Sequence, residues 1–365
     1  MSNILGNNLT LTIFGESHGS HIGCVIDGLC AGLKIDEDFI DQCLEKRRPK
    51  ASIETSRVEK DKYQIVSGVF NGYTTGSSIC IMIENSNISS KDYELNKDIA
   101  RPGHADYVAF KKYHGFNDYR GGGSFSGRLT TPIVIAGSII LKQLEKLNIK
   151  IGSHISKIGD ICDSNFSDYE NEIELVNKKE FPTIDQIEEK MKLEIEKAKN
   201  ESDSIGGIIE TAIINLPVGL GDPMFDSLES KISSSIFSLG GIKGIEFGLG
   251  FDFASIKGSK ANDPFIIKDG KVQTSSNNNG GINGGISNGM PITFKVVVKP
   301  TPSIYQAQKS INMKSNEETT IKIVGRHDPC IVRRVNIVIR CITALVIGDL
   351  LISRYGQEVF LKESL

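Results

Sequence analysis

Residues 131–147, TPIVIAGSIILKQLEKL, decide the fold class of this chain. The stretch is apolar at first and charged at its end, and Pro132 falls in the first turn, where a helix tolerates proline. It therefore predicts a long, largely buried helix. The stretch Ile337–Ile352 is similarly apolar, but it is short for a membrane span and carries Arg340 and Asp349. We interpret it as a second helix of the core.

Short segments around these two helices have the alternation or the compact apolar runs of β-strands. Strands are predicted at Leu9–Phe14, Cys24–Leu29, Gln64–Phe70, Ser78–Glu84, Ile208–Leu216, Ile245–Ile256 and Ile292–Val298. Further helices are predicted at Ala105–Tyr113, at Phe225–Leu239, from an Asp36 cap to about Arg47, and from Pro329 onward. Antiparallel strands combined with long apolar helices indicate an α+β layered fold. No G-x-G-x-x-G motif follows a strand, so a Rossmann domain is not indicated.

The composition excludes several classes of protein. The chain has 365 residues, of which 39% are hydrophobic and 24% charged, and its net charge is −3. It can build a sizeable core, but it lacks the basic charge of a dedicated nucleic-acid-binding protein. Seven cysteines without a C-x-x-C pair suggest neither a zinc site nor a disulfide framework, so we expect no metal and mostly buried, reduced thiols. With neither a secretory signal nor a membrane span in view, we expect a cytoplasmic protein with no membrane partner.

Residues 163–201 differ in composition from the rest of the chain. They are rich in Lys, Glu, Asp and Asn, and apolar residues recur at helical spacing from Ile184 to Ile195. This pattern predicts a peripheral, solvated helix that follows a mobile approach segment.

The first motif with chemical meaning is GESHG at residues 15–19, which matches the G-x-S-x-G elbow of serine hydrolases. In that reading Ser17 is the nucleophile. The elbow requires a strand, a sharp turn and then a helix, but residues 20–28 are punctuated by glycine and resemble a strand. Serine hydrolysis through Ser17 therefore remains the alternative function, and a simple turn around His18 remains the structural one.

A second motif, RPGHAD, occupies residues 101–106 and places His104 near a helix start. Histidine titrates near neutral pH, and the helix N-terminus together with Arg101 disfavours its charged form while attracting anions. The plainer alternative is that Asp106 caps the helix and His104 only packs against its neighbours.

The motif GRHDPC at residues 325–330 repeats the combination of Arg, His and Asp. Asp328 followed by Pro329 has the form of a helix cap with proline in the first helical position. Arg326 and His327 would lie just outside that helix and could reach into a cleft.

Two further motifs are basic. In RGGGSFSGRLT, residues 120–130, consecutive glycines and hydroxyl groups stand between Arg120 and Arg128, an arrangement that suits a phosphate group. The G-K-[ST] ending of a P-loop is absent, and a glycine-rich hairpin is the alternative. KRRP at residues 46–49 is by itself explained as the basic end of a helix.

Taken together, these segments resemble the chorismate synthase family, and the resemblance follows the chain in order. The matching segments are FGESHG at 14–19, RRP at 47–49, SGVF-NG-TTG at 67–76, RPGHADY at 101–107, RGGGSFSGRLT at 120–130, LPVGLGDPMFD at 216–226, IKGIEFG at 242–248, GGINGGISNGMPI at 280–292, KPTPS at 299–303 and GRHDPC at 325–330. Each segment alone is weak evidence, but ten in the same order are not a coincidence.

The resemblance implies a single domain over residues 1–365, a β-α-β sandwich with helices layered between antiparallel sheets. It implies a lyase of the shikimate pathway to aromatic amino acids that removes phosphate from 5-enolpyruvylshikimate 3-phosphate by 1,4-anti elimination. It further implies a requirement for reduced FMN and a homotetramer. The elimination involves no net redox change.

Roles for single residues follow from the same resemblance. His18 corresponds to the histidine that protonates the departing phosphate, His104 to the histidine near the flavin, and Asp328 to the carboxylate that assists proton removal through the flavin. The arginines expected to bind phosphate or carboxylate groups of the substrate, or an NADP phosphate, are Arg47, Arg48, Arg101 and Arg128. The residues expected to bind FMN are Ser124, Phe125, Ser126, Gly240, Gly241, Gly284, Lys299, Pro300, Thr301, Pro302, Ser303 and Arg326.

This sequence departs from the family pattern at two positions where many members have arginine. They are Ser124, which follows the glycine run, and Ile53, four residues after Pro49. Because Ile53 replaces a proposed NADP contact, we expect reduced flavin to come from an external flavin reductase, and NADPH to be used only if the chain reduces its own flavin. A protein that binds flavin or a nucleotide without catalysis is the third reading.

Overall fold

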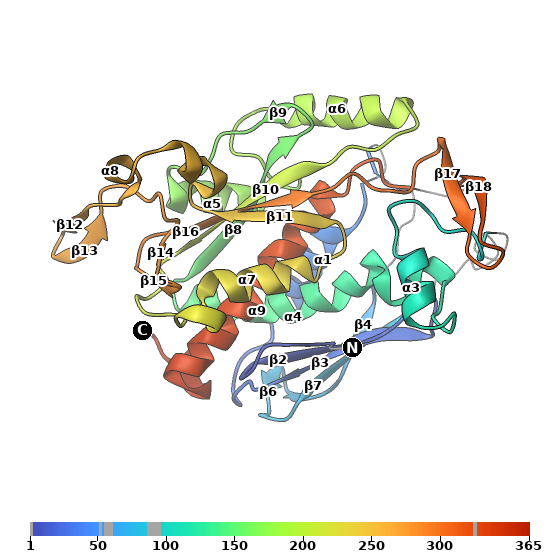
Figure 1. The fold of residues 1–365 in the computed structure, drawn as a ribbon. Helices are drawn as coiled ribbons and strands as arrows, with labels where there is room; N and C mark the ends of the chain where they lie inside the picture. The colour runs from blue at the N-terminus through green and yellow to red at the C-terminus, as the bar shows by residue number, and fades with distance from the viewer. Residues whose placement is uncertain (1–2, 51–52, 55–60, 86–95, 324–326) are drawn as a thin grey trace.

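Two antiparallel five-stranded sheets enclose a layer of helices in this computed structural model, which describes residues 3–50, 53–54, 61–85, 96–323 and 327–365 (Figure 1). The first sheet has the order β1-β2-β3-β7-β4, with strands at Ile4–Leu5, Thr10–Gly15, His21–Asp27, Ile79–Glu84 and Tyr63–Ser67. The second has the order β11-β16-β10-β8-β9, with strands at Ile242–Phe247, Ile292–Val298, Gly207–Ile214, Lys150–Ile158 and Ile161–Cys162. The predicted α+β sandwich is confirmed.

The other strands described form four two-stranded hairpins. They are β5–β6 at Val69–Phe70 and Tyr73–Thr74, β12–β13 at Phe265–Lys268 and Lys271–Thr274, β14–β15 at Ile282–Asn283 and Ile286–Ser287, and β17–β18 at Ala307–Asn312 and Glu317–Lys322. The α-helices are α1 (Glu37–Arg47), α3 (Asp106–Lys112), α4 (Thr130–Lys146), α5 (Tyr169–Lys178), α6 (Glu188–Asn200), α7 (Leu228–Phe237), α8 (Gly258–Ala261) and α9 (Val332–Tyr355). Short 3-10 helices lie at Arg120–Phe125, Gly127–Leu129, Met224–Asp226, Gly250–Ser255 and Gln357–Leu361.

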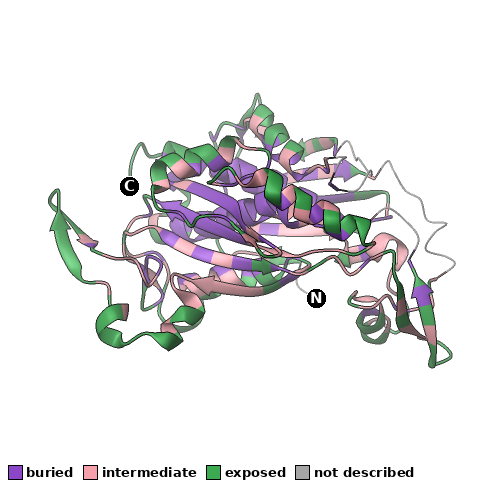
Figure 2. Cartoon of the chain, turned by 90° about the horizontal axis from the view of Figure 1, so that it is seen from above, coloured by how far each residue is buried: buried purple, intermediate pink, exposed green. Residues whose placement is uncertain are grey.

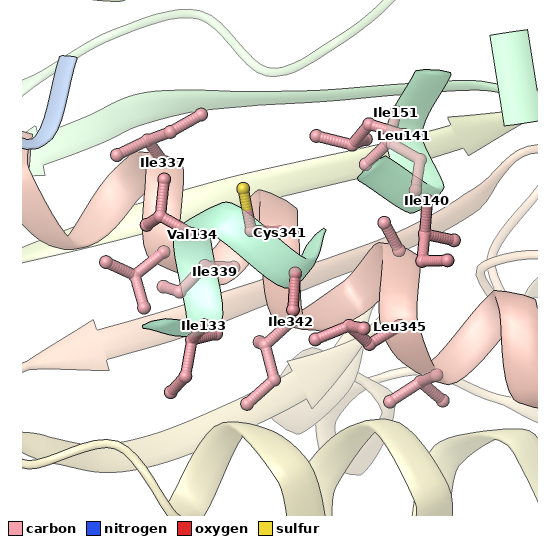
Figure 3. Close-up of a cluster of buried hydrophobic side chains, with 14 of the residues drawn as sticks. Ile133, Val134, Ile140, Leu141, Ile151, Ile337, Ile339, Cys341, Ile342 and Leu345 are labelled. Carbon is pink, nitrogen blue, oxygen red and sulfur yellow. The ribbon is translucent and has the colours of Figure 1, made fainter. Parts of the chain in front are cut away.

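Helices α4 and α9 form the centre of the core, where their apolar side chains interleave (Figure 3). A Cβ atom on Gly137 of α4 would lie 2.7 Å from the carbonyl carbon of Cys341 on α9, so this crossing requires glycine. By length and composition alone α9 could cross a membrane, but 94% of its most apolar window is buried inside the protein. The prediction of two core helices is therefore confirmed.

Of the helix caps predicted at Asp36 and Asp328, only the first is confirmed. Asp36 caps α1 as expected, because its carboxylate accepts a hydrogen bond from the Phe39 amide. The predicted cap at Asp328 is wrong, since α9 begins at Val332 and the cap position belongs to Ile331. Pro329 therefore precedes the helix rather than opening it.

Two other expectations need correction. The strand expected at Ile245–Ile256 is β11, which starts at Ile242 and ends at Phe247, where left-handed Gly248 turns the chain into a 3-10 helix. Residues 163–201 contain two helices, α5 and α6, instead of one helix after a mobile segment. Both bury apolar residues against the second sheet, among them Ile173 and Met191.

Candidate active site

His18 lies in a tight turn between two strands of the first sheet and packs against the glycine run. The ring is 4% exposed. Gly121, Gly122 and Gly123 have φ values of 60°, 83° and 52°, which side-chain-bearing residues rarely adopt. A Cβ atom on Gly121 would lie 2.5 Å from His18 Nε2. The glycine run therefore lets the backbone approach the imidazole closely, and it is not a hairpin turn.

The same turn does not form a hydrolase elbow. Ser17 is 3% exposed, and its amide donates to the Gly123 carbonyl at 3.2 Å. The chain then enters strand β3 at His21, whereas the elbow needs a helix at this place. The geometry gives Ser17 no nucleophilic role.

Arg47 and Arg128 converge on one buried carboxylate, that of Asp61. Arg47 Nη1 lies 3.2 Å from Asp61 Oδ2, and Arg128 pairs with the other carboxylate oxygen. Arg47 also donates to Thr130 Oγ1 at 2.9 Å, and Arg128 donates to Asn85 Oδ1 at 3.1 Å. Both arginines are therefore held by protein groups that fix the end of the glycine-rich segment. Asp61 was missed by sequence reasoning, because no local motif marks it.

Arg48 lies beside this network but contributes in a different way. Its carbonyl accepts a hydrogen bond from Arg333, which forms a buried ion pair with Glu54 at 2.5 Å. Its own side chain pairs with Glu45 on α1, and both are partly exposed. Ile53, which stands where many family members have arginine, is buried in the core and cannot bind a phosphate.

His104 is held by a hydroxyl group from a distant segment, since its Nε2 lies 2.7 Å from Ser303 Oγ. The pKa of His104 is lowered to about 4, first by burial and then by the positive charge of Arg101, while the carboxylate of Asp106 opposes the shift. The expectation that Arg101 disfavours imidazolium is confirmed, although burial is the larger cause. Asp106 does not cap α3; it accepts from Arg101 Nε and Nη2, both at 2.8 Å.

Segment 299–303 connects His104 to the glycines that precede β11. Lys299 Nζ donates to the Gly103 carbonyl at 2.8 Å, and the Lys299 amide donates to the Gly241 carbonyl at 2.9 Å. Gly240 has open space at its Cβ position, where the nearest atom is the Phe125 carbonyl oxygen at 4.0 Å. The three expected flavin segments, 124–126, 240–241 and 299–303, are therefore neighbours.

The remaining residues of segments 124–126 and 299–303 also have defined neighbours. The hydroxyl group of Thr301 is buried and has no hydrogen-bond partner among the described residues. Phe125 is half exposed, and Ser126 Oγ accepts from the Arg128 amide at 3.3 Å. Pro302 contacts Gly103, and Pro300 lies against Gly206. Ser124, in place of the family arginine, is partly buried.

Asp328 joins the site through its ion pair with Arg334, whose Nη1 lies 2.6 Å from Asp328 Oδ2. Arg334 Nε also donates to the Arg47 carbonyl at 3.0 Å, which links the start of α9 to the end of α1. Arg326 lies outside the described residues. The neighbouring His327 was assigned no role from the sequence. The centroid of its ring lies 5.3 Å from that of Tyr305.

Gly284 does not join these residues. It lies in the β14–β15 hairpin, at the opposite end of the molecule from α3 and the β17–β18 hairpin (Figure 1). Among the described residues, no group of three or more His, Cys, Asp or Glu side chains could hold a metal ion. The other predicted residues form two sets of contacts, one around His18, Arg47 and Arg128 and one around His104 and segment 299–303, which approach each other where Gly240 faces Phe125.

Known proteins resemble this chain over nearly its full length. The family model for chorismate synthase matches residues 9–352. A chorismate synthase from Pyrococcus abyssi is 45% identical over 97% of this chain and 99% of its own, and one from Dehalococcoides mccartyi is 44% identical over 96% of both. A crystal structure of a chorismate synthase superposes with a TM-score of 0.76 at 28% identity, covering 98% of this chain and 96% of that one.

Proposed function

This chain belongs to the chorismate synthase family, and from that premise we propose how its residues carry out the reaction. The enzyme is a carbon–oxygen lyase that converts 5-enolpyruvylshikimate 3-phosphate to chorismate, the last step of the shikimate pathway. Phosphate leaves from one ring carbon and a proton from another, with no net redox change. The protein must therefore stabilise a departing phosphate and remove a proton.

His18 is the proposed general acid for the phosphate. Its imidazole is buried at the glycine run, so that it is fixed in place and shielded from bulk water. Donating a proton to the phosphate lowers the charge on the leaving group, which is worth about a hundredfold or more in rate for a positioned acid. The positive-φ backbone of Gly121–Gly123 lies beside His18, and a glycine-rich run of this kind is suited to binding the same phosphate.

His104 and Asp328 are proposed to manage the proton that leaves the ring. Because burial and the charge of Arg101 lower the pKa of His104 to about 4, its imidazole is neutral at physiological pH. Ser303 fixes the orientation of the ring through Nε2. Asp328 is held by Arg334, which keeps its carboxylate in a defined position.

The residues present fit the phosphate and ribityl chain of FMN. Thr301 has a buried hydroxyl group with no partner among the described residues, and the Gly240 position leaves open space beside Phe125. Lys299 supplies a positive charge, and it is hydrogen-bonded to the carbonyl groups of Gly103 and Gly241. When bound, reduced FMN would supply the electron density that helps the phosphate to leave. Residues 124–126, 240–241 and 299–303 would hold it, and Arg326 is retained from the resemblance.

The four arginines expected at the substrate divide into two kinds. Arg47 and Arg128 are buried and pair with Asp61, so we propose that they position the glycine-rich segment. Arg101 and Arg48 are more exposed, although each pairs with a neighbouring carboxylate. We propose that these two bind the anionic groups of the substrate, where charge-assisted hydrogen bonds are strong.

The remaining expectations also stay proposals. We propose an external flavin reductase, because the proposed NADP contact is replaced by the buried Ile53. We propose a homotetramer, supported by the β12–β13 hairpin, which projects from one end of the molecule and exposes Phe265, Ile267 and Val272 (Figure 2).

One large apolar cluster spans both sheets, which supports a single domain. A cytoplasmic location fits the mostly buried cysteines.

The proximity of His18 to the glycine run and the hydrogen bond of His104 to segment 299–303 carry this proposal. The test is anaerobic phosphate release from 5-enolpyruvylshikimate 3-phosphate, with and without dithionite-reduced FMN. We expect release only with reduced FMN, with chorismate formed in equal amount. A folded protein that binds FMN but releases no phosphate would favour the non-catalytic alternative.

Variants of the two histidines test their roles separately. His18→Ala and His104→Ala should keep FMN affinity, read from flavin fluorescence, and lose most of their turnover. Ser17→Ala is the control, and it should keep turnover because Ser17 has no chemical role here. Full activity in both histidine variants would refute the assignments.

A further inference from the structure

A small cavity lies outside the candidate active site, between α1, α5, β8 and α9. Four cationic side chains line it, Lys46, Lys179, Arg333 and Arg340, together with the amide of Asn336. The cavity has a volume of about 10 Å³, which is room for one water-sized particle. Its lining is therefore cationic, and its occupant must be small.

Two of the four cations have close partners among groups that do not line the cavity. Arg333 forms its buried ion pair with Glu54, and Lys179 Nζ donates to the Thr183 carbonyl at 2.6 Å. The acidic group at the cavity, Glu180, lies 2.6 Å from Lys50 and is itself exposed. Glu180 attracts the charge of Lys46, but its carboxylate is exposed and pairs directly with Lys50.

At hydrogen-bonding distance, Lys46 and Arg340 contact only neutral groups. Lys46 Nζ donates to the Asn177 carbonyl, and Arg340 Nε donates to the Ile151 carbonyl at 2.9 Å. Within the described part of the chain Lys46 has no ion pair, and Arg340 Nη2 lies 3.9 Å from the partly exposed carboxylate of Glu145. Burial lowers the pKa of Lys46, and the charge of Arg340 lowers it further. A buried arginine and a half-buried lysine are costly to keep side by side when their nearest carboxylates, Glu145 and Glu180, are both exposed.

Asn336 adds a second, independent sign of a missing acceptor. Its side chain is 7% exposed and lines the cavity, and its Nδ2 has no hydrogen-bond partner among the residues that the structure describes. It stands one helical turn before Arg340, so both side chains point from the same face of α9. A buried donor without an acceptor costs about 1–3 kcal/mol. We propose that this cavity binds a monatomic anion of the chloride class, held by Asn336, Lys46 and Arg340.

Size and charge select this class of ligand. A cavity with room for one water-sized particle does not accommodate sulfate or phosphate without displacing its walls. A water molecule would accept the Asn336 hydrogen bond but would add no negative charge inside the cavity, where the nearest carboxylates, Glu145 and Glu180, are exposed. A halide satisfies the donor and the cations together, and it links the last turn of α1 to α9. The anion is structural, because the cavity contains none of the proposed catalytic residues.

The first test compares thermal unfolding of the full chain in sodium chloride and in sodium gluconate at equal ionic strength. The midpoint should be about 2 °C or more higher in chloride, since a ligand that binds only the folded state stabilises it. Asn336→Asp places a carboxylate among the cations, so this variant should lose the chloride dependence without losing stability in gluconate. Lys46→Met should also lose the dependence. Lys190→Met, a matched change at an exposed lysine, should keep it.

Equal midpoints of the unchanged protein in the two salts would overturn the proposal. So would an undiminished chloride effect in both Asn336→Asp and Lys46→Met. The second test is the anomalous scattering of crystals grown with sodium bromide. A bromide peak between Asn336 and Arg340 is expected, whereas an ordered water there would show that the cavity is only hydrated.

Discussion

Replacing His154 with leucine should destabilise the protein strongly and in a pH-dependent way. His154 on β8 has no exposed side-chain surface and lies between two carboxylates, with Nδ1 2.9 Å from Asp163 Oδ2 and Nε2 2.8 Å from Glu210 Oε2. Asp163 also accepts from the Ile184 amide at 2.6 Å, and Glu210 from the Phe166 amide at 3.1 Å. The imidazole thus fastens segment 163–184 to the second sheet.

The expected cost follows from what the variant leaves behind. Leucine fills much of the space but removes the positive charge, so two carboxylates are left facing each other in the interior. Breaking a buried ion pair in this way costs about 3–5 kcal/mol. The edge contact between His154 and Phe166, with centroids 4.7 Å apart, adds about 1 kcal/mol.

The sign of the pH dependence follows from the two partners. Burial alone would lower the pKa of His154, but hydrogen bonds to Asp163 and Glu210 outweigh it and raise the pKa above its usual 6.5. The stabilisation is therefore complete below about pH 6.5 and is lost as pH rises through the raised pKa. Burial alone would raise the pKa of Asp163, but hydrogen bonds, first of all from His154, lower it below 3.8. That contribution is lost only in stronger acid.

The assay is the thermal unfolding midpoint of the unchanged protein and of His154→Leu at pH 5.5, 7.5 and 9. The difference should be largest at pH 5.5 and smallest at pH 9. His21→Leu, a change at an exposed histidine on β3, is the control and should alter the midpoint little at any pH. A small penalty, or one that is equal at all three pH values, would refute the charged state of His154.

Three other changes test the candidate site. Gly121→Ala should reduce turnover more than tenfold, because its Cβ atom would lie 2.5 Å from His18 Nε2 and its φ is 60°, while Gly127→Ala, with open space around it, should be nearly silent in the same assay. Asp61→Asn should lower the unfolding free energy by about 3–5 kcal/mol, since asparagine tolerates the left-handed backbone here but leaves two buried arginines without their counter-charge; an unchanged urea midpoint would contradict this. His104→Gln should reduce the loss of stability on acidification from pH 6.5 to 4, because the pKa lowered to about 4 means that only the unfolded chain takes up a proton there; parallel pH curves of the two proteins would contradict it.

The sequence was sufficient wherever a signal is local. The long apolar runs predicted α4 and α9, since both helices are hydrophobic enough to be recognised without their partners. The Asp36 cap is set by residues within one turn. The family was identified through short motifs whose order along the chain can be recognised without knowledge of the fold.

Strand β8, which no prediction included, shows where local signals fail. Helices cover both of its faces, so Lys150–Ile158 is almost continuously buried and lacks the alternation of a half-exposed strand. Its sequence also contains Ser153 and His154, polar residues that are acceptable in the interior because partners from other segments bind them. The pattern that usually marks a strand is absent for a structural reason.

The charged residues of the site show the same limit at the level of chemistry. Arg47 and Arg128 were assigned to substrate or NADP phosphate groups through the family resemblance, yet the structure pairs both with Asp61, which no motif marks. His104 illustrates the converse: Arg101 is visible in its motif and does lower its pKa, but burial, which arises only from the packed fold, lowers it more. The identity of a charged residue is thus readable from sequence, whereas its counter-charge and its burial are properties of the assembled structure. These two properties decide whether an arginine binds substrate or holds the scaffold, and they give His154 and His104 opposite responses to pH.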